Sequence, residues 1–190
     1  MTAAAQPTLQ PGKVYRTAEL ATWSANPTRL AARLVQRGEL VRLRHGLFSV
    51  PRRSRFGEVP PSDDALLDAL LDDSPYLITG PPRWNALGLG ATALFASTLV
   101  YNTRRSGVFE LAGRRFLLRR VRFPDPPTPE WFVIDLFNNA QQAGQSEAAL
   151  TEALARAVQA GRFDRDQLNA MARAYSTRAI QQHIAEATTP

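Results

Sequence analysis

The chain lacks cysteine and has one lysine and two histidines among its 190 residues. Without cysteine there can be neither a disulfide framework nor a thiolate metal site. His45 and His183 lie far apart and fit no metal-binding spacing, so we expect no metal and no cofactor. Since Lys13 is the single lysine, a P-loop lysine and a Schiff-base lysine in the body of the chain are excluded. With no carboxylate pair at catalytic spacing either, we expect no catalytic residues and no enzymatic activity.

Long apolar runs are also missing. The nearest one, from Ala86 to Val100, is short and is interrupted by glycine, serine and threonine. Such a run is too polar to span a bilayer. The start of the chain has no basic residues followed by an apolar stretch, which argues against a signal peptide. We therefore expect a soluble, cytoplasmic protein with no membrane partner.

Positive charge is concentrated in one quarter of the chain, residues 13–55, which we call the basic block. It holds Lys13 and nine arginines against two glutamates, a net charge of +8, whereas the whole chain carries +6. The rest therefore sums to about −2. A basic segment attached to a near-neutral remainder is typical of a nucleic-acid-binding module that carries a second domain. Arginine as a mere solubilising residue would explain the total charge but not its clustering.

Helix signals and strand signals follow one another within the basic block. Asn26 suits a helix N-cap, Pro27 the first helical position and Gly38 the stop, which predicts a helix over 27–37. An earlier, shorter helix is expected in "YRTAELATWS", with Thr17 as its N-cap. After Gly38 the apolar residues alternate with arginines and the chain turns at His45-Gly46, which predicts a β-hairpin. Two helices and a hairpin wing predict a winged helix-turn-helix over 13–56, after a flexible N-terminus at 1–12.

The second predicted domain covers 57–190, beyond the linker "SRFGEVPPS". We expect an α+β domain: a helix capped by Ser62, a strand "YLIT", a helix started by prolines, and an antiparallel meander of three strands in "STLVYNT", "GVFELAG" and "RRFLLRRVRF". A helical C-terminal tail follows, near 131–143, 146–160, 164–174 and 176–186. The aspartates of the helix capped by Ser62 suit an exposed face better than a metal cluster; they are Asp63, Asp64, Asp68, Asp72 and Asp73. The stretch "GLGATA" lacks the context of a dinucleotide fingerprint.

The candidate DNA-binding residues come from the helix start and the wing, because a recognition helix enters the major groove by its N-terminal part and a wing approaches the minor groove or the backbone. They are Ser24, Asn26, Thr28, Arg29, Arg33, Arg42, Arg44, His45, Arg52 and Arg53. Each has a plainer interpretation. Asn26 is first of all a helix cap, Arg33 suits a solvated face, and Arg52 and Arg53 suit ordinary linker charges.

Three stretches occur in order over most of residues 14–122: "LAARLVQRGELVRLRHGLFSVP", "RWNALGLGA" and "LVYNTRRSGVFELAGRRFLLRRV". Together they resemble the winged-helix antitoxins of AbiEi type, from type IV toxin-antitoxin systems, and their transcription-regulator relatives. The resemblance implies an antitoxin that represses its own operon through the N-terminal module. It also implies two partners: double-stranded operator DNA, and a co-encoded nucleotidyltransferase-like toxin that the rest of the chain neutralises.

A second interpretation stays open, a winged-helix transcriptional regulator whose C-terminal domain senses a ligand or dimerises. A DNA-modifying enzyme is disfavoured by the scarcity of lysine and histidine and by the absence of paired carboxylates. A nucleotidyltransferase gene immediately downstream would favour the antitoxin over the regulator.

Overall fold

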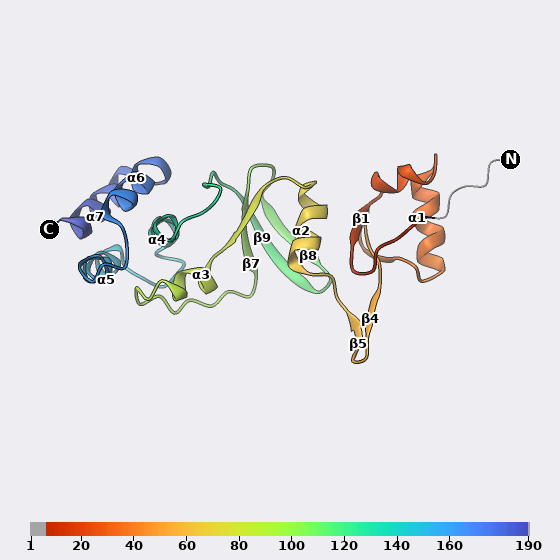
Figure 1. Ribbon diagram of the computed structural model, residues 1–190, viewed down its shortest axis with the longest axis horizontal. Helices are drawn as coiled ribbons and strands as arrows, with labels where there is room; N and C mark the ends of the chain where they lie inside the picture. Colours follow the sequence, from red (N-terminus) through yellow and green to blue (C-terminus); the bar gives the residue numbers. More distant parts are fainter. Residues whose placement is uncertain (1–6, 190) are drawn as a thin grey trace. The chain divides into compact units, whose positions relative to one another are not determined.

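The computed structural model describes residues 7–189, which form a mixed α+β fold (Figure 1). The chain divides into two compact units. The first contains Met1–Tyr76 and Phe109–Arg115, and the second contains Leu77–Val108 and Phe116–Pro190. No helix in the described part of the chain has both the length and the apolar character needed to cross a bilayer.

In the first unit, the basic block forms a three-stranded sheet with one α-helix. Strands β1 (Val14–Arg16), β2 (Val41–Arg44) and β3 (Leu47–Ser49) are arranged in the order β1-β3-β2, with both pairs antiparallel. Helix α1 (Pro27–Gln36) packs its apolar face into the core beside this sheet. The buried residues of this core are Tyr15, Leu20, Leu30, Ala31, Leu34, Leu40, Phe48 and Val50.

Helix α1 begins and ends where the sequence predicts. Asn26 Oδ1 accepts a hydrogen bond from the backbone N–H of Arg29 at 3.0 Å, and Pro27 is the first helical residue. At the other end, Gly38 has a φ of 71° and its N–H donates to the Val35 carbonyl at 3.0 Å. A left-handed glycine after the last turn satisfies carbonyls that the helix itself leaves unpaired.

The prediction of an α-helix in "YRTAELATWS" is wrong. Tyr15 and Arg16 lie in β1, and only Glu19–Thr22 are helical, as the short 3₁₀ helix η1. Thr17 is not its cap, because the N-cap position is Ala18 and no side chain caps the helix. Antiparallel pairing of β1 with β3 buries Tyr15 to 4% exposure, and this tertiary contact overrides the local helical spacing.

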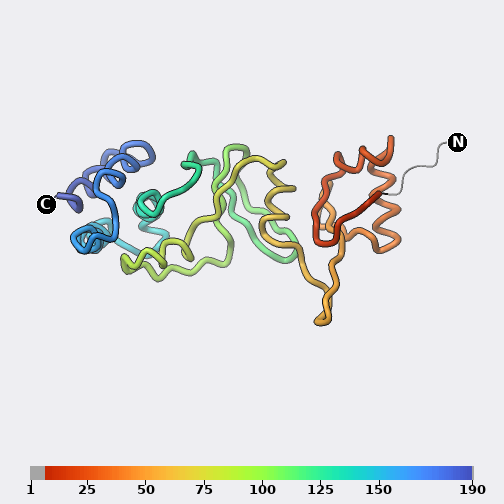
Figure 2. Tube along the Cα trace, viewed as in Figure 1, coloured from red at the N-terminus to blue at the C-terminus, as the bar shows by residue number. Residues whose placement is uncertain are grey.

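The segment expected to be a linker also has regular structure. Strands β4 (Arg52–Ser54) and β5 (Gly57–Val59) pair antiparallel as a separate two-stranded sheet, drawn in orange in Figure 2. Helix α2 (Asp63–Leu71) follows, and its N-cap Ser62 accepts a hydrogen bond from the Ala65 N–H, as the sequence predicts. The first compact unit continues to Tyr76, whereas the sequence placed the division near Gly57.

Part of the N-terminal segment expected to be flexible is held by the fold. Residues 1–6 lie outside the described residues. Beyond them, Leu9 packs against the core of the basic block, and the Gly12 N–H donates to the Val50 carbonyl at 3.0 Å. The described part of this segment is therefore tied to the end of β3.

The four-stranded sheet is not an antiparallel meander. Strands β6 (Tyr76–Thr79), β7 (Thr98–Asn102), β8 (Gly107–Leu111) and β9 (Arg114–Arg120) have the order β6-β7-β9-β8, and β7 pairs with β9 in parallel. The turn at Ala112–Gly113 is so short that it can only join β8 and β9 as antiparallel neighbours. Strand β9 therefore lies between β7 and β8. Alternation along a strand predicts which residues are buried, but it does not say which strands are neighbours.

The helices of the second unit are α3 (Pro81–Ala86), α4 (Pro129–Asn138), α5 (Glu147–Gln159), α6 (Arg165–Tyr175) and α7 (Arg178–Thr188). The predicted helical C-terminal tail is thus confirmed. Thr128, Ser146 and Asp164 cap three of these helices through their side-chain oxygens. Helix α4 is the most deeply buried, with seven of its ten residues inside the protein.

A buried carboxylate joins α4 to its neighbours in this unit. Asp135, on α4, is 2% exposed. Its Oδ2 accepts hydrogen bonds from Thr79 Oγ1 at 2.5 Å and Trp84 Nε1 at 2.7 Å. Its Oδ1 accepts from Tyr101 OH at 2.8 Å and Asn139 Nδ2 at 3.1 Å. The four donors come from β6, α3, β7 and the C-terminal end of α4, so the carboxylate connects all of these segments.

Burial sets the ionisation of this network. Burial raises the pKa of the Asp135 carboxyl, while its hydrogen bonds and the charge of Arg119 act in the opposite direction. Burial also raises the pKa of Tyr101, and the neighbouring carboxylate raises it further. Tyr101 therefore keeps its proton at neutral pH and remains a donor.

Replacing Asp135 by asparagine should lower the free energy of unfolding by about 2–4 kcal/mol, because the amide nitrogen would face two buried donors that need an acceptor. Urea unfolding followed by circular dichroism measures this change. Asp166→Asn is the matched control, because Asp166 is exposed in the first turn of α6 and should change stability by at most about 0.5 kcal/mol. Equal stability of the two variants would contradict the structural role given to Asp135.

Candidate nucleic-acid interface

The exposed face of α1 carries two arginines one helical turn apart. Arg29 and Arg33 are both exposed, on the side away from the buried Leu30 and Leu34. Thr28, in the first turn, is exposed as well. Residues four apart lie on the same side of a helix, so the two guanidinium groups can reach the same surface. The predicted placement of these three residues on a free face of the helix is confirmed.

Ser24 and Asn26 are engaged in local structure just before α1. The Asn26 N–H donates to Ser24 Oγ at 3.1 Å, and Ser24 Oγ donates to the Asn26 carbonyl at 3.3 Å. The Asn26 side chain uses its Oδ1 to cap the helix, and the residue as a whole is exposed. The capping role is thus confirmed, and Asn26 keeps one amide donor for a ligand.

The hairpin formed by β2 and β3 displays the next group of candidates. Arg42, Arg44 and His45 are all exposed, and the turn falls at His45 and Gly46 as the sequence predicts. The register shifts between Arg42 and Arg44, so a bulge interrupts the simple alternation of the strand. Arg42 Nη2 lies 3.5 Å from His45 Nδ1, and the Arg44 guanidinium lies over the Phe109 ring, 5.2 Å from its centre.

Arg52 and Arg53 lie in β4 and are exposed. A Cβ atom on Gly12 would lie 3.5 Å from Arg52 Cδ, so the stem of this arginine lies beside the N-terminal segment. Arg53 is opposite Glu58 in the register of the hairpin. Both arginines therefore belong to a defined β-ribbon and not to an irregular linker.

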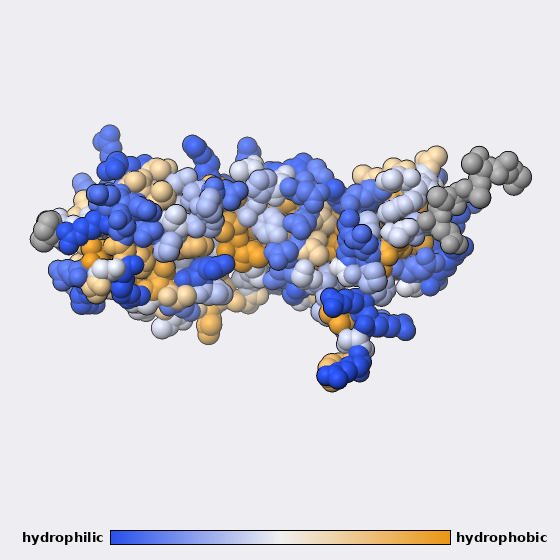
Figure 3. All heavy atoms as spheres, viewed as in Figure 1, coloured by the Kyte–Doolittle hydropathy of each residue, from blue (hydrophilic) through white to orange (hydrophobic). Residues whose placement is uncertain are grey.

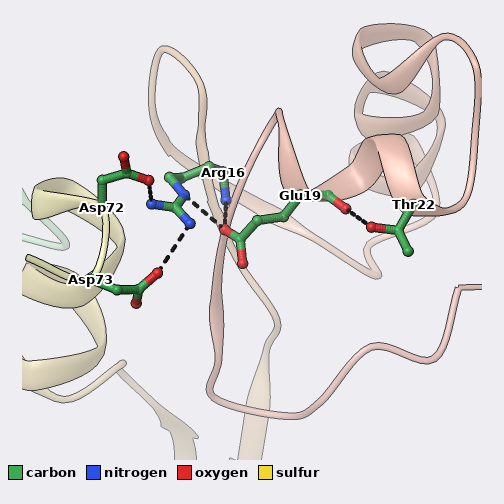
Figure 4. Close-up of polar contacts among 5 residues, drawn as sticks. All are labelled: Arg16, Glu19, Thr22, Asp72 and Asp73. Carbon is green, nitrogen blue, oxygen red and sulfur yellow. Dashed lines mark hydrogen bonds and ion pairs between the residues drawn. The ribbon is translucent and has the colours of Figure 1, made fainter.

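One arginine of the basic block is neutralised by three carboxylates, two of which come from outside the block. Arg16 pairs with Asp72, lies 3.2 Å from Asp73 Oδ2, and binds Glu19 Oε2 through its Nε at 3.2 Å (Figure 4). Its backbone N–H also donates to Glu19 Oε2, at 2.7 Å. The two aspartates follow the end of α2, so this cluster fastens α2 to β1 within the first unit. Arg16 is unavailable to a nucleic acid.

A second arginine of the block, Arg37, lies 3.8 Å from Glu39. Removing Arg16 and Arg37 from the ten cations leaves eight, all exposed and none within ion-pair distance of a carboxylate of the described chain. They are Lys13, Arg29, Arg33, Arg42, Arg44, Arg52, Arg53 and Arg55. Sequence reasoning missed Arg55 and its neighbour Phe56, because it assigned both to an unstructured linker.

The second unit has a surface hollow of about 400 Å³ between the turn after α3 and helix α5. Gly88 and Gly90 line one side, and alanines of α5 line the other together with Arg156 and Arg162. Arg162 Nη2 donates to the Leu87 carbonyl at 2.6 Å, which fixes the turn. Arg156 is exposed at the edge of the hollow. Over residues 7–189, no three histidine or acidic side chains are grouped closely enough to hold a metal ion.

The chain is similar in fold to a protein of known structure. No family model matches the sequence, and no curated protein matches it. Among solved structures, the crystal structure of the RV2827C protein from Mycobacterium tuberculosis superposes with a TM-score of 0.50 at 14% sequence identity, covering 93% of this chain and 72% of that chain. At this identity the similarity concerns the fold alone.

The two roles open to Asn26 can be separated by substitution. Asn26→Ala should lower the free energy of unfolding by about 1 kcal/mol, because the Arg29 N–H loses its acceptor. Asn26→Asp keeps the capping oxygen, so its stability should stay close to that of the wild type while the amide donor is lost. Thermal unfolding of the two variants tests this. If Asn26→Asp is destabilised as much as Asn26→Ala, capping is not what Asn26 contributes.

Proposed function

We propose that the basic block is a winged helix-turn-helix that binds double-stranded DNA. The observation that carries this proposal is a set of eight exposed cations that have no carboxylate partner among the described residues. Six lie on α1, the β2–β3 hairpin and β4, Arg55 lies in the β4–β5 turn, and Lys13 lies just before β1. Arginines that neutralise phosphates release condensed counterions, and this release drives DNA binding. Since no carboxylate within residues 7–189 pairs with these eight cations, a polyanion is the partner that suits them.

In this proposal α1 is the recognition helix. Its N-terminal turn holds Thr28 and Arg29 beside the free amide of Asn26, which are residue types that read base edges or hold phosphates. Arg33 extends the same face by one turn. The β2–β3 hairpin, with Arg42, Arg44 and His45, is the wing.

Binding should be strongly dependent on salt. Affinity for duplex DNA should fall on the order of 10³-fold between about 50 and 200 mM salt if about six phosphates are neutralised. If Arg29 or Arg33 contacts a phosphate, its replacement by alanine should reduce the slope of log affinity against log salt by about 1. If it contacts a base, the replacement should weaken binding by about 1–3 kcal/mol and relax the specificity at that base position. Fluorescence anisotropy with the DNA upstream of the chain's own gene measures both effects.

Arg173→Ala is the matched control, because Arg173 is exposed on α6 in the second unit. It should leave affinity and slope unchanged. A flat salt titration of the wild type, or unchanged binding by both α1 variants, would refute the assignment of this interface.

We further propose that the chain is an antitoxin that represses its own operon and neutralises a co-encoded nucleotidyltransferase-like toxin. Support for this comes from the three ordered stretches that resemble the AbiEi-type antitoxins. In this arrangement the first unit carries DNA binding, and the second unit, with its helices α4–α7, is the surface offered to the toxin.

Co-expression tests the antitoxin role in the full chain. The wild type should restore the growth of cells that express the neighbouring nucleotidyltransferase gene. The double variant with alanine at Arg29 and Arg33 should restore growth equally well while losing operator binding, because its second unit is unaltered. Failure of the wild type to restore growth would exclude the antitoxin role and leave DNA binding standing.

One observation favours the alternative, a transcriptional regulator that senses a ligand. The hollow beside α5 presents Arg156 at its edge and glycine backbone on its wall, which is a setting suited to a small anion. In that case the wild type would bind its upstream DNA but would not protect cells from a toxin.

A further inference from the structure

The end of the β4–β5 hairpin exposes a large aromatic side chain. Phe56 is 85% exposed, although a phenylalanine ring contributes to stability mainly by being buried. Short hairpin loops favour glycine, asparagine and aspartate, so turn chemistry does not call for phenylalanine here either. Neither burial in the core nor the residue preferences of the turn explain a phenylalanine at position 56. Exposure alone does not mark a binding site, but Phe56 is at the end of a hairpin that carries three arginines.

The hairpin holds Phe56 in a defined position. The Phe56 N–H donates to Ser54 Oγ at 3.1 Å, and Ser54 Oγ in turn donates to the Gly57 carbonyl at 3.2 Å. Gly57 has a φ of 112°, a backbone conformation that residues with a Cβ atom rarely adopt. Below the turn, Arg52 pairs with Val59 and Ser54 with Gly57 in a regular antiparallel register. The tip is therefore preorganised, which lowers the entropy lost on binding.

The charges around the tip are those of a DNA-binding arm. Residues 52–59 hold three arginines against one glutamate, a net charge of +2. The Arg55 guanidinium lies over the Phe56 ring, 4.6 Å from its centre. In Figure 3 the hairpin labelled β4 and β5 in Figure 1 is mostly strongly hydrophilic, with a small apolar patch at its end. An apolar end flanked by arginines suits a surface that offers phosphates beside stacked bases.

We propose that this hairpin is a second DNA-contacting arm, which inserts Phe56 between two base pairs of duplex DNA from the minor groove. Arg52 and Arg55 hold the phosphates on either side. Proteins that enter the minor groove commonly use an apolar wedge to unstack one base step, with arginines along the groove. Pyrimidine–purine steps such as TA unstack most easily, so the hairpin binds A·T-rich sequences in preference to others. This inference rests on the proposed DNA binding by α1 and adds to it a contact that kinks the duplex.

The test uses the full chain and a duplex of about 30 base pairs, long enough for both elements, with 2-aminopurine replacing adenine at its TA steps. Unstacking raises 2-aminopurine fluorescence, so binding of the wild type should increase the signal. Phe56→Ala should abolish this increase and weaken binding about 10-fold, the effect of losing one stacked aromatic ring. Phe56→Trp should preserve the increase, and its own indole emission should be quenched on binding.

Leu94→Ala is the matched control, because Leu94 is 91% exposed but lies in the second unit. It should behave as the wild type. Netropsin, which fills the minor groove of A·T duplexes, should suppress the fluorescence increase. Circular dichroism checks that the Phe56 variants are folded.

The outcomes separate this inference from the function it rests on. If the wild type binds DNA and is weakened by Arg29→Ala, but Phe56→Ala leaves both affinity and fluorescence unchanged, the wedge is refuted and DNA binding stands. A fluorescence increase that persists with netropsin refutes the minor-groove assignment. If the wild type binds no duplex even at low salt, both the proposed DNA binding and the insertion of Phe56 are refuted. Phe56-dependent binding to anionic lipid vesicles, with no Phe56 effect on DNA, also refutes the wedge.

Discussion

The second unit depends on one buried carboxylate. Burying a carboxyl group away from water is expensive, and the fold offsets this by supplying four donors to the two oxygens of Asp135. These hydrogen bonds form together only when β6, α3 and β7 are all in place around α4. The network thus couples the sheet to the helix and favours a single arrangement of these elements, because any alternative packing would leave several buried polar groups unpaired.

In the first unit, some cations form ion pairs that stabilise the fold and others remain exposed without a carboxylate partner. Arg16 is inside the basic block by sequence, yet it serves to hold Asp72 and Asp73 after α2. The remaining arginines are exposed on α1 and on two hairpins, and Lys13 is exposed just before β1; none of them lies within ion-pair distance of a carboxylate of the described chain. Like charges repel one another in the free protein, and this repulsion would be relieved by a bound polyanion. In the proposed function, the exposed arginines are therefore unpaired because their partner is the nucleic acid.

The two hairpins of this unit differ in how they are supported. The β2–β3 hairpin is part of the three-stranded core sheet, in which Leu47 and Phe48 of β3 are buried while the edge strand β2 and the turn are mostly exposed. The β4–β5 hairpin is a sheet of its own, and its stability comes from the turn bonds of Ser54 and from its backbone pairing. Two strands alone are marginally stable in water, so a short ribbon that exposes Phe56 fits a binding role better than a structural one.

The features of this protein that the sequence predicts correctly are local ones. The limits of α1, the Ser62 cap, the exposure of Arg29 and Arg33 and the helical tail all follow from interactions within four residues along the chain, where propensity, capping and periodicity act directly. Tertiary structure alone decided that Tyr15 joins a strand, that β9 separates β7 from β8, and which groups surround Asp135. The reason is physical: partners in these contacts are tens of residues apart, and loop closure brings many alternative pairs together at similar entropic cost, so only the packing of the whole core selects among them.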